Sequence, residues 1–171
     1  MTTLPSTATR NGTTGRDLTG ILVVAIPVSD LARSAAWYRD LLDLEYVREF
    51  SDGEQVTGCG LADWAVPYMI ALRLRSTVPG EPDLRGEHPI ILEAADPAAA
   101  DRLRTRAEAL CIPVTSGEHK DGTWLEFPDP DGIALRVVHS AAGPRGFLGV
   151  GADGFYDTPR LALSGVEAGA R

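Results

Sequence analysis

Five side chains in this chain are the candidates for acid–base work or ion pairing at a site. They are His88, His119, Glu126, Arg73 and Arg136. A carboxylate or an imidazole in a cavity can act as a general base, so Glu126 and His119 are the candidate catalytic residues. A carboxylate that meets a guanidinium forms a strong charge-assisted hydrogen bond, and either arginine could supply it for Glu126. His88 opens a predicted strand, where a solvated strand-edge position is the simpler interpretation.

Aromatic side chains supply the candidate binding surface. They are Phe50, Trp64, Tyr68 and Trp124. Aromatic rings with a few polar groups suit a planar or amphipathic small molecule, although core packing is the alternative for each ring. Trp64 stands in a predicted loop, where core packing explains it less well. Trp124 shares a strand face with Glu126 because alternate strand residues point the same way. The pattern leaves open whether that face points inward or to solvent.

A β-hairpin must position Glu126 and Arg136. Residues 122–138 alternate apolar and polar side chains on both sides of the turn Asp129-Pro130-Asp131-Gly132. Proline fixes φ at the second turn position, and glycine accepts a positive φ at the end of the turn. We therefore interpret the two aspartates as turn-formers rather than as an acidic site.

The order of predicted elements is the same in both halves of the chain. Each half has a strand, a helix and three more strands, with an aspartate such as Asp30 or Asp96 as the helix N-cap. The first half has strands over 20–28, 44–50, 55–61 and 68–75 and a helix over 31–42. The second has strands over 88–94 and 112–115, a helix over 97–110, a loop over 116–121, and the hairpin.

These elements divide the chain into five segments. Residues 1–19 are rich in Thr and Gly and are expected to be a disordered leader. The domain covers 20–140, with a first module over 20–76, a Pro- and Gly-rich linker over 77–87 and a second module over 88–140. Residues 141–171 contain enough apolar side chains that this extension is expected to pack on the domain or on a partner.

Composition excludes several functional classes. The chain has 171 residues, 44% of them hydrophobic, and a formal net charge of −8. An acidic chain does not suit nucleic acid and mildly favours a cationic small ligand. No apolar run is long enough for a membrane helix. Neither of the two cysteines lies in a C-x-x-C motif, and we expect reduced thiols in a cytoplasmic protein.

Three segments resemble the vicinal oxygen chelate superfamily, which includes glyoxalase I, extradiol dioxygenases and fosfomycin- and bleomycin-resistance proteins. Residues 28–44, VSDLARSAAWYRDLLDL, resemble its opening, in which V-x-D-L-x-R-S-x-x-F-Y is followed after a short spacer by L-G-L, with Asp43 where glycine is usual. The strand, helix and I-P-V run over 92–114 and the D-P-D-G hairpin also match. The resemblance implies an α+β fold, in which two tandem βαβββ modules form a cupped mixed β-sheet.

The resemblance also implies four positions for the ligands of a divalent metal. Counting from the helix-capping aspartates and the hairpin glycine places Val23, Ala71 or Arg73, Pro89 and Arg136 at these positions. None is a usual ligand, and an arginine repels a cation. His88 is one residue away, but a shift of one residue turns a strand side chain to the opposite face. We therefore expect no cofactor; Fe, Ni, Mn or Zn on His88 and Glu126 is the alternative.

Three functions remain open at this point. The first is a metal-independent binding protein of the bleomycin-resistance type, commonly a homodimer, that sequesters a small molecule through Phe50, Trp64, Tyr68, Arg73, Trp124 and Arg136. The second is an enzyme, either a metal-dependent lyase, isomerase or dioxygenase, or a metal-free tailoring enzyme that uses Glu126 or His119 as base. The third is a structural partner whose cup is filled by its own extension.

Overall fold

The computed structural model describes residues 20–66, 68–119, 122–140, 150–151 and 154–155. The predicted leader lies outside the described residues, as does most of the predicted extension. The described part of that extension consists of β9 (Val150–Gly151) and β10 (Gly154–Phe155), and β10 lies beside the second sheet at its outer strand.

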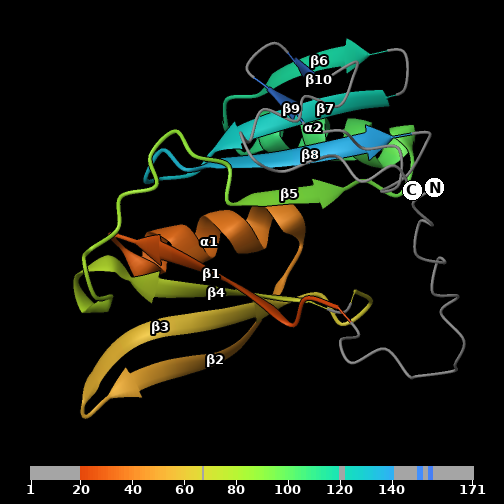
Figure 1. Ribbon diagram of the computed structural model, residues 1–171. Helices are drawn as coiled ribbons and strands as arrows, with labels where there is room; N and C mark the ends of the chain where they lie inside the picture. Colours follow the sequence, from red (N-terminus) through yellow and green to blue (C-terminus); the bar gives the residue numbers. More distant parts are fainter. Residues whose placement is uncertain (1–19, 67, 120–121, 141–149, 152–153, 156–171) are drawn as a thin grey trace, which may run out of the picture.

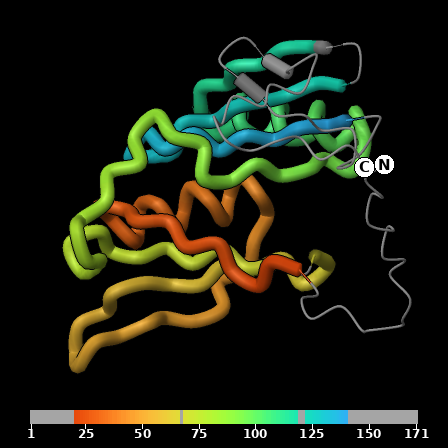
Figure 2. The backbone as a smooth tube through the Cα atoms, in the orientation of Figure 1, coloured from red at the N-terminus to blue at the C-terminus, as the bar shows by residue number. Residues whose placement is uncertain are grey.

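Two successive βαβββ modules form the α+β fold, as the element order predicted. The first contains β1 (Val23–Val28), α1 (Leu31–Leu42), β2 (Glu45–Asp52), β3 (Gln55–Ala62) and β4 (Met69–Leu74), followed by the 3-10 helix η1 (Arg75–Thr77). The second contains β5 (Ile90–Glu93), α2 (Pro97–Ala109), β6 (Thr115–His119), β7 (Gly122–Pro128) and β8 (Ala134–Ser140). The linker between them passes once from one module to the other (Figure 2).

Each module has a four-stranded mixed sheet with the same topology. The strand orders are β1-β4-β3-β2 and β5-β8-β7-β6, and the first strand of each module runs parallel to its fourth. The other neighbours are antiparallel. In Figure 1 the second module lies above the first, with α1 between β5 and the first sheet. We call the face of each sheet that is opposite its helix the cup face.

The other face of each sheet packs on the helices and forms one core across both modules. Alternate residues of the strands, and residues three or four apart on the helices, are apolar on this face, because they are buried against a neighbouring layer. The largest members are Ile26, Tyr38, Leu41, Leu61, Ile70, Leu72, Leu125, Phe127, Ile133 and Leu135. Asp30 and Asp96 cap α1 and α2 as predicted, each accepting a backbone N–H three residues later.

The turn between β7 and β8 is bonded to the first module. Buried Asp129 accepts a hydrogen bond from the Tyr38 hydroxyl at 3.0 Å and from two backbone N–H groups of its own turn at 2.8 Å each. Asp131 accepts the backbone N–H of Ser29 and a guanidinium N–H of Arg75, both at 2.9 Å. The two aspartates therefore do more than form the turn, because they also join the modules.

The prediction for the start of the hairpin sheet was wrong. The strand expected over 112–115 is β6 over Thr115–His119, inside the stretch expected to be a loop. Ser116 and Gly117 have low strand propensity, but they pair with Leu125 and Trp124 of β7. Ile112 and Val114 instead pack against the core from irregular backbone.

None of the helices within the described ranges is long and apolar enough to cross a membrane.

Candidate functional site

A compact polar cluster occupies the cup face of the second sheet. Glu126 of β7 and Arg136 of β8 are directly opposite each other. The Arg136 Nε donates to Glu126 Oε2 at 3.0 Å, and Nη2 donates to the same oxygen. The His88 Nε2 lies 2.8 Å from that oxygen and 2.9 Å from Arg136 Nη2. We call these three residues, with Trp124, the cup-face cluster.

The imidazole of His88 can satisfy only one of these contacts at a time. If Nε2 carries a proton, it donates to the Glu126 carboxylate, and the Arg136 Nη2 is then only a close neighbour. If Nε2 is unprotonated, it accepts from the guanidinium and cannot bond to the carboxylate. The cluster therefore has two hydrogen-bonded states that differ in the position of one proton.

Burial differs across the cluster, and hydrogen bonds decide the charge of Glu126. The Arg136 side chain is 4% exposed, while those of Glu126 and His88 are 25% and 33% exposed. Burial on its own would raise the pKa of Glu126, but hydrogen bonds from Arg136 and then His88 outweigh it, so the pKa is lowered. Glu126 is therefore ionised at neutral pH, and it is a weak base.

Trp124 forms the base of the cluster. The Arg136 guanidinium carbon lies 5.2 Å from the centre of the Trp124 ring system, within the range of a cation–π interaction. The indole lies across Gly117 of β6, where an added Cβ would be only 2.6 Å from the indole nitrogen. A glycine at that position therefore leaves the space that the ring occupies.

The end of the linker positions His88. The Ala134 N–H donates to the Glu87 carbonyl at 2.9 Å, and the Gly86 N–H donates to the Gly132 carbonyl at 2.8 Å. These bonds hold the segment against the start of β8, next to Arg136. β5 begins at Ile90, so His88 lies before the strand and strand alternation does not fix its direction. His88 is exposed just before the strand, as expected for the strand edge, and it also bonds to the cluster from irregular backbone.

Phe50 and Arg73 lie together on the cup face of the first sheet. An added Cβ at Gly58 would be 3.1 Å from atoms of both side chains, and one at Gly60 would be 3.6 Å from the Phe50 ring. The Phe50 ring therefore lies over two glycines of β3. The residue directly opposite Arg73 on β3 is Gly58. Arg73 is exposed and has no ion-pair partner among the described residues.

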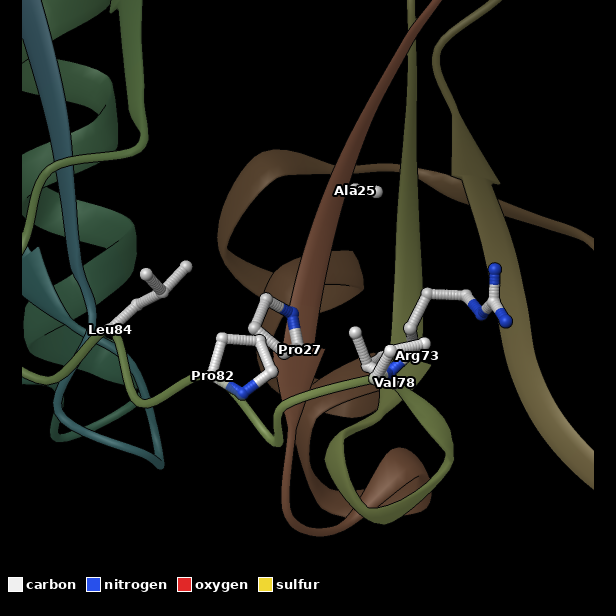
Figure 3. Close-up of a pocket in the computed structure, with 7 residues that line it drawn as sticks. Ala25, Pro27, Arg73, Val78, Pro82 and Leu84 are labelled. Carbon is white, nitrogen blue, oxygen red and sulfur yellow. The ribbon is translucent and has the colours of Figure 1, made fainter.

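Arg73 also borders a groove between the first sheet and the linker (Figure 3). We call it the linker groove. Its volume is about 360 Å³, and it is lined by Ala25, Pro27, Arg73, Val78, Pro79, Pro82 and Leu84. In Figure 3 the Arg73 side chain runs from β4 toward β3, so its guanidinium lies on the side away from Pro82 and Leu84.

Two of the candidate aromatic residues lie elsewhere. Trp64 is 71% exposed in the connection after β3, where its indole N–H donates to Glu45 at 2.8 Å. Half-buried Tyr68 borders a second cavity, of about 210 Å³, at the junction of the modules. Burial and then the nearby Asp63 carboxylate raise the pKa of Tyr68. The side chain of His119 lies outside the described residues, and its backbone pairs with Gly122.

The comparisons with known proteins identify the family. A family model described as the Glyoxalase/Bleomycin resistance protein/Dioxygenase superfamily matches residues 20–137. This chain belongs to that superfamily. Its members bind small molecules, often form dimers and often use divalent metals. No curated protein sequence matches the chain.

Solved structures of the superfamily share the fold at low sequence identity. TnmS3, an antibiotic binding protein from Streptomyces sp. CB03234, has a TM-score of 0.60 at 18% identity over 74% of this chain and 99% of its own. Lactoylglutathione lyase from Agrobacterium tumefaciens has a TM-score of 0.59 at 23% identity, and the match covers 74% of this chain and 98% of its own. The fosfomycin resistance protein FosX from Listeria monocytogenes has a TM-score of 0.56 at 14% identity, and the match covers 72% of this chain and 94% of its own.

The cup-face residues do not fit the divalent metal that many superfamily members use. Within the described ranges, no three His, Cys, Asp or Glu side chains lie close enough together to hold an ion. The two possible donors, His88 and Glu126, both contact the Arg136 guanidinium. A cation bound to both donors would therefore meet a fixed positive charge within the same coordination shell.

Sequence reasoning missed the glycines that make room for the cup-face side chains. Gly58 and Gly60 stand at alternate positions of β3, and Gly117 faces Trp124 from β6. Glycine inside a predicted strand was the available signal, because it often marks a close approach of another group. It also missed the bonds from Tyr38 to Asp129 and from Arg75 to Asp131, for which no local pattern exists.

Proposed function

We propose that this protein binds a small organic molecule on the cup faces of its sheets, without the divalent metal that many of its relatives use. It would sequester or carry that molecule, as bleomycin-resistance-type proteins do. The observation that carries the proposal is the buried Arg136 guanidinium, which is paired with Glu126 and lies over Trp124. It places a permanent cation at the position that the resemblance assigned to a metal ligand.

The shape and lining of the cup faces support this proposal. The linker groove has the volume of a typical small-molecule site, about 300–1,000 Å³, and its lining is mostly apolar. Phe50 offers a half-buried aromatic surface held over glycine, and Trp124, which is 9% exposed, supports Arg136 from below. TnmS3 is described as an antibiotic binding protein, so an antibiotic is one ligand to test. At that low identity the likeness supports the fold alone, and the site carries the argument.

We further propose a cytoplasmic homodimer. Exposed apolar side chains lie along and before β1 and on β5, including Leu22 at 80%, Val23 at 38% and Ile91 at 42% exposure. Such surface is commonly covered by a second chain. Cys59 and Cys111 are both free thiols, which suits a reducing compartment. Light scattering of the purified protein measures the assembly directly, and a monomer at micromolar concentration contradicts the homodimer.

An enzyme of the same fold is the second candidate. A histidine held by a carboxylate, as His88 is by Glu126, is an arrangement used in general-base catalysis. Glu126 itself suits that role less, because its lowered pKa makes it a weak base near neutral pH. A lyase, isomerase or dioxygenase that binds its metal on these two residues would first have to displace Arg136.

Metal analysis and tryptophan fluorescence test the proposal together. The purified protein is expected to contain no stoichiometric Ni, Mn, Fe or Zn. Titration with bleomycin and other planar or cationic antibiotics is expected to quench emission from Trp124. Trp124→Phe is expected to remove that response, while the matched variant Trp64→Phe retains it, because Trp64 lies in the connection after β3, outside the cup-face cluster, and bonds to Glu45. A stoichiometric metal that is lost in His88→Ala would contradict the metal-independent function.

A further inference from the structure

We propose that the linker groove takes an apolar or aromatic carboxylic acid, and that Arg73 pairs with its carboxylate. This inference rests on the proposed function, because it names the chemical class of the molecule bound on the cup face of the first sheet. It also replaces the cationic ligand that the net charge of −8 mildly favours. The local charge at a site governs recognition at contact distance, where the charge of the whole chain matters less.

The groove walls select an apolar body. Of the seven lining residues that the structure describes, six are apolar, and three of these are prolines: Pro27 on β1, and Pro79 and Pro82 on the linker. Proline rings fix their own backbone and lose little entropy when a ligand packs against them. Ala25 is exposed on β1, so its methyl group leaves depth at the floor of the groove. These features suit a flat hydrocarbon or an aromatic ring between sheet and linker.

The charge at the groove is uncompensated. Among the described residues, Arg73 is the one charged residue that lines it, and none of them provides a carboxylate partner for it. The contrast with Arg136 shows why. Arg136 faces Glu126 across its strand pair, whereas Arg73 faces Gly58, which has no side chain. A guanidinium left in this way keeps its N–H groups for a ligand that extends from the groove toward β3 (Figure 3).

The geometry of the guanidinium favours a carboxylate. Its planar fork of N–H donors matches the two oxygens of a carboxylate and can bond to both. The aliphatic part of Arg73 lies alongside Phe50 at Gly58, so the charged end reaches the edge of an apolar surface. An amphipathic acid therefore finds an apolar surface for its hydrocarbon part and a guanidinium for its carboxylate. In this proposal the ring packs against the proline wall, and the carboxylate meets the Arg73 guanidinium, which lies toward β3 in Figure 3.

Isothermal titration calorimetry with three naphthalene probes tests the inference. Naphthoate, naphthylmethanol and naphthylmethylamine share one apolar body and carry a negative, neutral and positive group. The wild-type protein is expected to bind naphthoate about tenfold more tightly than either of the others, as one charge-assisted hydrogen-bond pair implies. Arg73→Gln is expected to remove that preference, and Arg73→Lys to keep part of it. Arg102→Gln, which makes the same change on exposed α2, is the matched control.

A second variant tests the groove itself. Ala25→Leu fills the floor without a change of charge and is expected to abolish binding of all three probes. Equal binding of the three probes, or unchanged naphthoate binding in Arg73→Gln, overturns the role of Arg73 and leaves small-molecule binding in place. Unchanged binding in Ala25→Leu overturns the groove as the site. If the wild-type protein binds none of the probes, this inference fails, and small-molecule binding at the first sheet fails with it.

Discussion

The Arg136 guanidinium and the Glu126 carboxylate face each other across the β7–β8 pair and meet at a single oxygen, Oε2, which accepts from both Nε and Nη2 of the arginine. The arginine is almost fully buried, while the glutamate stays one quarter exposed. The pair therefore fixes a cation below the surface and an anion at it. This arrangement makes the cluster sensitive to the loss of either partner.

Replacing Arg136 with Met is expected to lower the free energy of unfolding by about 2 kcal/mol. Breaking a fully buried pair costs about 3–5 kcal/mol, and the partial exposure of Glu126 reduces this. Urea denaturation followed by circular dichroism measures the change. Adding Glu126→Gln to this variant is expected to recover part of the loss, because no unpaired carboxylate remains. Additive losses in the double variant would show that the two side chains are not coupled.

The stability contributed by Glu126 depends on pH in a defined direction. Its pKa is lowered in the folded state from an ordinary value of 4.5. A depressed pKa stabilises the fold fully above the unfolded-state value, and this contribution is lost as pH falls through the lower folded-state value. The difference in unfolding free energy between wild type and Glu126→Gln is therefore expected to be constant above about pH 5 and to shrink below about pH 4. A difference that grows on acidification would contradict the assigned direction.

Removing the guanidinium is expected to create metal affinity. Arg136→Glu adds a carboxylate next to His88 and Glu126 and removes the positive charge between them. Three such donors are the protein ligands that Zn²⁺ commonly uses. Calorimetric titration with Zn²⁺ is expected to show one site per chain in this variant and none in wild type. Arg136→Gln removes the charge without adding a carboxylate and serves as the control. Equal Zn²⁺ binding by wild type would contradict the exclusion of a metal by Arg136.

Gly117→Ala is expected to displace the Trp124 indole. The added methyl group would lie 2.6 Å from the indole nitrogen and 2.9 Å from a ring carbon. We expect a red-shifted tryptophan emission and a loss of about 1 kcal/mol in unfolding free energy, as overpacking usually causes. Gly20→Ala is the matched control, since an added Cβ there meets nothing within 4 Å. Unchanged emission in Gly117→Ala would show that the ring does not depend on this glycine.

Asp129 is expected to contribute to stability rather than to catalysis, because it accepts three hydrogen bonds in the buried turn. Asp129→Ala leaves the Tyr38 hydroxyl and two backbone N–H groups without their acceptor, so we expect a loss of about 3 kcal/mol. Tyr38→Phe removes one of these three bonds, and its expected loss is about 1 kcal/mol. Thermal denaturation ranks the two variants. A larger effect for Tyr38→Phe would place the stability in the tyrosine rather than in the aspartate.

Much of the fold could be predicted because its signals are local. The caps at Asp30 and Asp96 and the apolar spacing after them gave α1 and α2 almost to the residue. The wrong strand at 112–115 shows the limit of this reasoning. Thr115–His119 carries little strand propensity, and it is a strand because β7 pairs with it and Trp124 fills the space over Gly117. Tertiary pairing decided that segment, and no pattern within it records the partner.

The candidate site divides in the same way. Alternation placed Trp124, Glu126 and Arg136 on one strand face or on facing strands, and the structure brings their side chains together. His88 joins them through backbone bonds from Gly86 and Glu87 to the hairpin, which join segments far apart in sequence. Residue type alone also cannot show which aromatic side chains lie on a cup face. Phe50 lies there beside Arg73, whereas Trp64 bonds to Glu45 and Tyr68 borders the cavity at the junction of the modules.

The glycine at position 58 also limits how the sequence can vary. The simplest way to neutralise Arg73 would be an acidic residue directly opposite it, as Glu126 is to Arg136. A Cβ at Gly58 would lie 2.5 Å from the Leu72 carbonyl oxygen, which is backbone and cannot move aside cheaply. No single substitution at this position can therefore supply the missing carboxylate without a shift of β3 against β4. The side chain that pairs with Glu126 in the second sheet therefore has a counterpart in the first sheet whose opposite position is sterically restricted to glycine.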